Sequence, residues 1–113
     1  MSATVTKTFE FSASHAEGDK VVGHNYILKC VYLAADASAE EGLTEKIQRD
    51  VIQKLHSRDL GQSVDFLKNV PLNDLAILRT LWRVITEATR PAQLHSLCLI
   101  RDRQTEWTLT PTT

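Results

Sequence analysis

Two segments near the N-terminus alternate between apolar and polar residues, and each carries a histidine on its apolar face. Side chains two residues apart point to the same face of a strand. In the first segment that face holds Val5, Phe9, Phe11, Ala13 and His15. In the second segment it holds Val22, His24, Tyr26, Leu28 and Cys30. The alternation predicts two strands, at about residues 4–14 and 24–34, joined by a short polar loop at residues 16–21.

Histidines on neighbouring strands supply two of the three protein ligands that a catalytic zinc ion usually has. Val22 lies where another histidine would complete the set, and valine offers no lone pair. Loss of an outer-shell group alone weakens metal binding by about 10–100-fold, so losing a direct ligand should weaken it at least as much. His56 and His95 belong to a helix end and a distant strand and are not expected to substitute. We predict no metal ligands and no cofactor, zinc included; His15 and His24 otherwise fill a half-buried sheet.

Length and charge limit the class of protein. A chain of 113 residues is expected to form one domain, residues 1–113. Its net charge of −1 predicts no basic surface for nucleic acid. Its apolar stretches are shorter than a membrane span, and Met1 to Thr8 lacks the apolar region of a signal peptide. Cys30 and Cys98 lie outside any C-x-x-C pair, so we expect reduced thiols and a cytoplasmic location, with a disulfide between them left open.

A first helix is predicted from an apolar residue at every fourth position: Leu43, Ile47, Val51 and Leu55. Ser38 is expected to cap this helix, and Glu40 and Glu41 are expected in its first turn, where carboxylates favour the helix dipole. The helix should end near Ser57-Arg58. A polar loop then follows at about residues 59–70.

A second helix is expected to begin at Pro71, with Asn73 and Asp74 in its opening turn, and to end at Arg90-Pro91. Its apolar residues cover more than one face: Leu75, Ile77, Leu78, Leu81, Trp82, Val84 and Ile85. So broad a surface predicts burial against both the sheet and another subunit. Two last strands are expected at about 94–101 and 105–110. The order β-β-α-α-β-β predicts an α+β fold, an antiparallel sheet with two helices on one face.

Two motifs connect this pattern with a known family. Phe-Ser-Ala-Ser-His at residues 11–15 and Gly-His-Asn-Tyr at residues 23–26 resemble the motifs of the 6-pyruvoyltetrahydropterin synthase family, which includes the 6-carboxytetrahydropterin synthases. His15 matches the first zinc ligand of the family and His24 the third, whereas Val22 replaces the second. The resemblance implies the T-fold, in which sheets of several subunits join into a barrel and two trimeric rings form a hexamer. Closing the barrel would remove the unpaired edges of the sheet.

The resemblance also implies a reaction for which this chain lacks the residues. In the family, zinc, a cysteine and an aspartate–histidine pair act on protons of the substrate side chain. No cysteine lies between His15 and His24. The Leu-Asp-His motif of the family falls on Leu60-Gly61-Gln62, and a register that recovers Asp59 puts leucine at the histidine position. We therefore predict no catalytic residues and no synthase (lyase) activity, that is, a pseudoenzyme.

Pterin recognition is left open by the sequence. Family members hold the ring with a Pro-Thr-x-Glu segment at the start of the second helix and with a glutamate that ends the third strand. Here residues 71–74 keep the proline and an acid. One register places Arg101 at the glutamate position, and a shift of one residue places Asp102 there. The candidate ligand-binding residues are Leu72, Asp74 and Asp102; alternatively, Asp74 is a helix-dipole partner and Asp102 a turn residue.

These observations predict a divergent homologue of the pterin synthases that binds a pterin-like heterocycle in a pocket between subunits. The expected assembly is a homohexamer, a dimer of trimers, with no nucleic acid or membrane as partner. Two alternatives stay open. One is a metal-independent enzyme in which His15 and His24 exchange protons with a pterin or purine-like substrate. The other is a non-catalytic structural or regulatory subunit.

Overall fold

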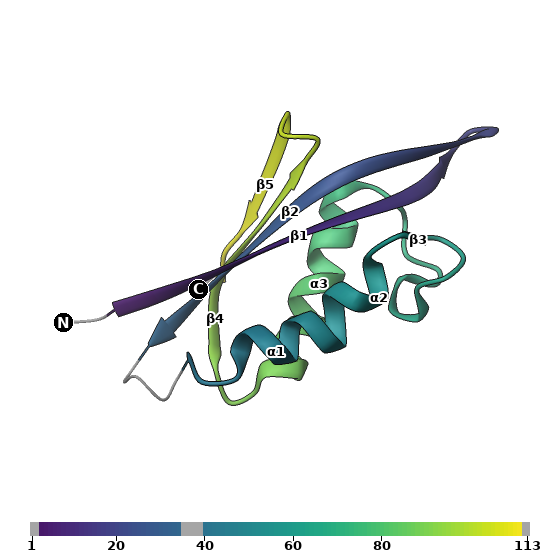
Figure 1. Ribbon diagram of the computed structural model, residues 1–113. Coiled ribbons are helices and arrows are strands. Elements are labelled where there is room, and N and C mark those ends of the chain that lie inside the picture. Colours follow the sequence, from purple (N-terminus) through teal and green to yellow (C-terminus); the bar gives the residue numbers. More distant parts are fainter. Residues whose placement is uncertain (1–2, 35–39, 112–113) are drawn as a thin grey trace.

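The computed structural model describes residues 3–34 and 40–111 and shows a five-stranded sheet with helices packed on one face (Figure 1). The strands are β1 Ala3–Glu17, β2 Lys20–Ala34, β3 Arg58–Asp59, β4 Gln93–Arg101 and β5 Thr105–Leu109. The helical segments are α1 Leu43–Ile47, η2 Gln48–Ile52, α2 Gln53–Leu55, η3 Asp65–Leu67 and α3 Asp74–Thr89. The predicted α+β class is confirmed. Within the described residues, no helix is long and apolar enough to cross a membrane.

β1 and β2 form one long antiparallel hairpin whose closed end reaches beyond the helices (Figure 1). The predicted loop at residues 16–21 is wrong, because pairing continues to Glu17 and Lys20 and leaves a two-residue turn. Gly18 opens this turn with a φ of 65°, the positive value that such turns need at their first position. The polar residues suggested a loop, but strands that extend beyond the core need no apolar face. The extension matters because it places Glu17 on a strand.

The sheet has the strand order β3-β1-β2-β4-β5. The four long strands pair antiparallel, as predicted. The short β3 was not predicted; it pairs parallel to β1 at Ala13 and Ser14 and makes the sheet mixed. It is too short to produce a period-two pattern. β5 forms one edge of the described sheet, and its Trp107 is 42% exposed.

The first helix runs through α1, η2 and α2 without a break. Its predicted apolar stripe is buried: Leu43, Ile47, Val51 and Leu55. A strict four-residue spacing drifts around an α-helix of 3.6 residues per turn, and the wider π-turn at η2 offsets that drift. Glu40 and Glu41 precede the helix rather than forming its first turn, and Glu40 instead pairs with Lys7 at 2.8 Å. Ser38, the predicted cap, lies outside the described residues.

The second helix, α3, begins at Asp74 rather than at Pro71. Asn73 is its N-cap, and its side chain accepts a hydrogen bond from the N–H of Ala76 at 2.9 Å. The buried residues of α3 are Ile77, Leu78, Leu81, Ile85 and, at its last position, the polar Thr89. Trp82 and Val84 are partly buried against the core. The cap places Asp74, the first helical residue, close to the end of β4.

The core lies between the helices and the inner face of the sheet. Phe11 and Tyr26 stack there across β1 and β2, with ring centroids 4.9 Å apart. In the predicted period-two sets the inner face is confirmed, because Phe9, Leu28 and Cys30 are also buried. Toward the hairpin turn the same face changes from apolar to polar. His15 and His24 lie where this change begins.

Candidate functional site

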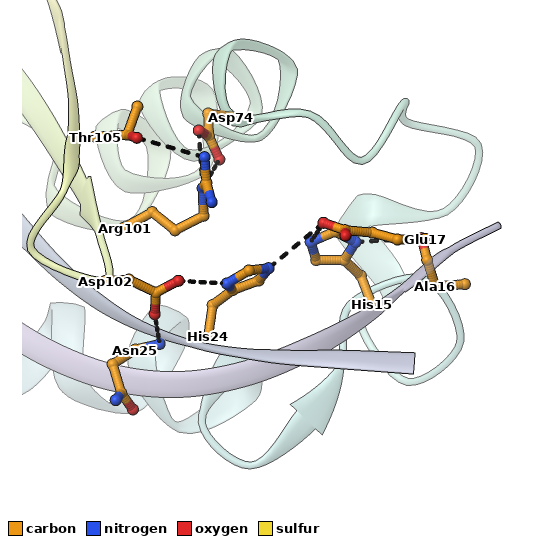
Figure 2. Close-up of polar contacts among 9 residues, drawn as sticks. All are labelled: His15, Ala16, Glu17, His24, Asn25, Asp74, Arg101, Asp102 and Thr105. Atoms are coloured by element: carbon orange, nitrogen blue, oxygen red, sulfur yellow. Dashed lines mark hydrogen bonds and ion pairs between the residues drawn. The ribbon is translucent and has the colours of Figure 1, made fainter. Parts of the chain in front are cut away.

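A polar cluster continues the apolar face of the sheet toward the hairpin end (Figure 2). It is built from four elements, because β1, β2, the end of β4 and the start of α3 meet there. Its members are His15, Glu17, His24, Tyr26, Asp74, Arg101 and Asp102. Period two places its members from β1 and β2 on one face of the sheet. The sequence predicted two histidines together, and the structure adds two carboxylates that contact them, Glu17 and Asp102.

His24 is held by Asp102. Its Nδ1 lies 2.6 Å from Oδ2 of Asp102, and the other carboxylate oxygen accepts the backbone N–H of Asn25 at 2.9 Å. These contacts hold the pKa of Asp102 below its ordinary value, the Asn25 hydrogen bond first and the His24 contact second. An ionised carboxylate can only accept, so Nδ1 of His24 donates. The Nε2 atom of His24 is then left buried and has no hydrogen-bond partner among the described residues.

His15 lies beside His24 with the ring centroids 5.1 Å apart. Its side chain is buried, and its Nδ1 lies 3.3 Å from the carbonyl oxygen of Ala16. A carbonyl oxygen accepts only, so this contact also favours a proton on Nδ1. In the neutral imidazoles, these contacts leave the lone pair on Nε2, and both Nε2 atoms face the same space.

Glu17 lies at that space, as Figure 2 shows. Its Oε1 atom is 3.6 Å from Nε2 of His15 and 3.6 Å from Nε2 of His24. The three potential ligand atoms lie within 4.8 Å of one another. Sequence reasoning missed Glu17 because it was assigned to a loop. The signal that would have found it is the spacing of His15 and Glu17, two residues apart on one strand.

The two histidines and the glutamate form a donor set that fits a divalent metal ion. Two histidines and a carboxylate are one of the ligand sets of catalytic zinc. The buried Nε2 of His24, which has no hydrogen-bond partner among the described residues, is the observation that supports the fit. The prediction of no metal ligands and no bound zinc considered histidines alone, and it stays a prediction.

Asp74 and Arg101 form an ion pair beside the histidines. Nε of Arg101 lies 3.2 and 3.1 Å from the two carboxylate oxygens of Asp74, and Nη2 is 3.5 Å from Oγ1 of Thr105. The hydrogen bond to Asp74 raises the pKa of Arg101. Asp74 therefore already has a charged partner within the chain, which sequence reasoning did not foresee. The two residues are 27 positions apart, and only the packing of α3 against β4 brings them together.

Asp102 occupies the turn between β4 and β5, as the alternative interpretation of this residue predicted. Its φ of 53° is positive, and Arg103 follows with a φ of 57°. Such angles are uncommon outside glycine and asparagine or aspartate. The backbone N–H of Asp102 donates to the carbonyl of Asn25 at 2.7 Å, so the residue is tied to β2 at both backbone and side chain.

Tyr26 belongs to the polar cluster, whereas Leu72 lies against the hydrophobic core. The hydroxyl of Tyr26 is buried without a hydrogen-bond partner among the described residues. Its pKa is raised to about 12, by burial first and by the charge of Asp74 second. Leu72, a predicted ligand-binding residue, packs against the hydrophobic core instead of lining the polar cluster.

A cleft of about 510 Å³ opens beside Asp102. Its polar lining includes Ser12, Asn25, His56, Asp102 and Arg103. Oγ of Ser12 donates to Oδ1 of Asn25 at 2.7 Å, and Nδ1 of His56 accepts the N–H of Ser12 at 3.1 Å. His56 is exposed past the end of α2, as expected. The volume lies within the range of small-molecule sites.

The two thiols and the loop after β3 are the places where sequence reasoning predicted that a proton relay is missing. Cys30 is buried in β2, and burial raises its pKa to about 12. Cys98 is in β4, where Sγ donates to Glu106 at 3.0 Å. Both cysteines are free. In the segment 60–62, the N–H groups of Gly61 and Gln62 donate to Asp59, and no ionisable side chain is present.

Together these features define a class: an α+β protein with a polar centre of two histidines and three carboxylates at one end of its sheet. The solved structure of the 6-pyruvoyl tetrahydropterin synthase from Caenorhabditis elegans is similar to the chain, with a TM-score of 0.85 over 99% of this chain and 97% of that one. The sequence identity is 16%, so the similarity shows the fold, which is the T-fold. No family model and no curated protein sequence matches the chain.

Proposed function

We propose that this chain is a divergent 6-pyruvoyltetrahydropterin synthase homologue that binds a pterin-like heterocycle without converting it. The proposal rests on the fold together with one local observation. Asp102 is held in a positive-φ turn by Asn25 and His24, and it lines the cleft of about 510 Å³.

Asp102 is the carboxylate we assign to the heterocycle. Each of its oxygens accepts one hydrogen bond within the chain and keeps a second lone pair. An ionised carboxylate can receive two donors from the edge of a 2-amino-4-oxo ring. Asp74 is a weaker candidate, because both of its carboxylate oxygens already accept hydrogen bonds from Nε of Arg101.

Lack of synthase activity follows from the residues that surround the histidines. The hairpin from His15 to His24 contains no cysteine, and the buried Cys30 thiol has a pKa of about 12. A thiol at that pKa supplies almost no thiolate near neutral pH. The loop that follows β3 contributes neither aspartate nor histidine at residues 60–62.

Assembly into a cytoplasmic homohexamer of two trimers is part of the proposal. Strand β5 forms a sheet edge with the exposed Trp107, and β3 covers β1 only at Ala13 and Ser14. Unpaired edges favour pairing with another chain. In such an assembly, a neighbouring subunit would complete the ligand pocket beside Asp102.

Calorimetric titration with neopterin and biopterin tests the binding. Wild type should bind, and Asp102→Asn should weaken binding by about 10–100-fold, because a charge-assisted contact is lost. Asp65→Asn is the matched control, since the Asp65 side chain in η3 is 99% exposed and Asp65 is not among the residues that line the cleft. Chromatography of a reduced pterin after incubation should show no conversion. Absence of binding at millimolar ligand would contradict the proposal and favour a structural subunit.

One observation favours the alternative of a metal-independent enzyme. The 2.6 Å contact of Asp102 with Nδ1 of His24 orients the imidazole and leaves Nε2 available to accept a proton. This alternative predicts turnover of a reduced pterin or purine substrate that disappears in both His15→Gln and His24→Gln. Turnover that survives both substitutions would exclude it.

A further inference from the structure

Three atoms that can accept hydrogen bonds meet at the hairpin end, and no residue in the described part of the chain places a donor between them. They are Nε2 of His15, Nε2 of His24 and Oε1 of Glu17, each histidine nitrogen being 3.6 Å from the glutamate oxygen. The histidine side chains are each only 8% exposed. The Nε2 atom of His24 is buried and has no hydrogen-bond partner among the described residues, and a buried polar atom left unpaired is unfavourable. The arrangement calls for a cation, either a metal ion or an added proton.

Two features favour a metal ion over a proton. The first is distance: an imidazolium and a carboxylate form a hydrogen bond at about 2.7–2.9 Å, and both contacts here are 3.6 Å. Two ligands about 2.1 Å from a tetrahedral ion are themselves roughly 3.4 Å apart. The second is symmetry, since the carboxylate oxygen is equally far from both nitrogens. A proton would draw it toward one of them.

The groups that contact Nδ1 of each histidine are of the kind found next to metal-bound imidazoles. A metal-bound imidazole usually donates its other N–H to a carboxylate or to a backbone carbonyl. Asp102 takes that place behind His24 at 2.6 Å, and the carbonyl of Ala16 takes it behind His15 at 3.3 Å. Both contacts keep the proton on Nδ1 and the lone pair on Nε2, which is the form that binds metal.

We infer that His15, Glu17 and His24 bind one divalent transition-metal ion, with Glu17 supplying the third ligand that Val22 cannot supply. The carboxylate comes from β1 rather than from β2, so the position lost on one strand is replaced from its neighbour. All three ligands then belong to one hairpin. A carboxylate also gives the centre one negative charge that a third imidazole would not. The inference is independent of heterocycle binding, because its test uses metal alone.

Binding of zinc chloride and cobalt chloride to the chelator-treated full chain tests this centre. Wild type should bind one ion per chain, and the cobalt form should show the visible absorption of a four-coordinate site. Glu17→Gln should weaken zinc binding by at least about 100-fold, because a direct ligand is lost. Asp19→Asn is the matched control: it removes one negative charge from the turn of the same hairpin, and binding should change by less than about threefold.

A ligand exchange separates coordination from general electrostatics. Val22 pairs directly with His15 across the strands, so a histidine at position 22 lies on the face of the other two. The double variant Glu17→Ala, Val22→His should recover at least about tenfold of the affinity lost in Glu17→Ala alone. Asp102→Asn should weaken zinc binding by about 10–100-fold with the stoichiometry unchanged.

Circular dichroism of each variant verifies folding before the metal titration. A stoichiometry well below one zinc per chain in wild type would overturn the inference. So would equal zinc affinities of wild type and Glu17→Gln, since the glutamate would then be an ion-pair partner only. Recovery by the histidine at position 22, together with an unchanged Asp19→Asn control, would support it.

Discussion

At the scale of single residues, the sequence identified the histidines but not their partners. His15 and His24 lie together because period two on paired strands is a local rule. Asp102 reaches His24 over 78 positions and Arg101 reaches Asp74 over 27. Such contacts depend on how α3 and β4 pack, which no local pattern specifies. Glu17 was within reach of sequence reasoning, but its polar neighbours suggested a loop.

Arg101 decides what Asp74 can do. Arg101→Gln should release the Asp74 carboxylate and strengthen binding of neopterin if Asp74 then accepts donors of the ring. The same change should lower the free energy of unfolding by about 1 kcal/mol or less, because the pair is partly exposed. Calorimetry and urea denaturation measure both effects. Weaker neopterin binding in this variant would instead show that Arg101 itself contacts the ligand.

At the scale of elements, the long periodic segments were predictable and their ends were not. The four long strands and the stripe from Leu43 to Leu55 follow from patterns of apolar residues. The start of α3 was missed by a few residues, because Pro71 and Asn73 are both favoured near a helix start and only Asn73 makes the cap. β3 is two residues long and leaves no pattern to detect.

The hairpin turn gives a direct test of the β1–β2 register. Gly18→Ala should lower the free energy of unfolding by about 1 kcal/mol, because alanine disfavours the φ of 65°. Gly23→Ala, in the same hairpin, is the control. Gly23 has no positive φ, and nothing lies within 4 Å of an added methyl, so a small effect is expected. Urea denaturation of both variants measures the difference. Equal losses in the two variants would contradict the observed turn.

At the scale of the whole molecule, the buried ionisable groups make stability sensitive to alkaline pH. Burial raises the pKa of Cys30 from 9.0, and that of Tyr32 from 10.0, to about 12 in each case. The unfolded chain therefore ionises first, and the free energy of unfolding falls as pH rises from 9 toward 12. Each group contributes a slope of at most about 1.4 kcal/mol per pH unit in that range.

Urea denaturation at pH 8 and pH 10.5 tests this slope. The stability contribution is fully present below pH 9, so values near neutral pH should agree with one another. Cys30→Ala should show a smaller decrease between the two pH values than wild type, because one of the groups that the unfolded chain ionises near pH 9 is absent. A decrease of the same size in both proteins would mean that Cys30 does not contribute to the slope.

Assembly is a second property of the whole molecule, and the open edge at β5 makes it testable. We expect light scattering at micromolar concentration to give the mass of a hexamer. Trp107→Lys on that edge should shift the distribution toward smaller species, because a charge opposes edge pairing. A wild-type monomer or dimer under these conditions would contradict both the assembly and the shared pocket.

The central claim is that the polar centre near Asp102 is a ligand site that has survived the loss of the synthase residues. A crystal structure of the assembled protein grown with neopterin tests this claim most directly. We predict an unconverted ring against the Asp102 carboxylate, in the cleft lined by Asn25 and Arg103 and closed by a second subunit. A cleft filled by side chains of the neighbouring subunit, with no room for a ring, would contradict it.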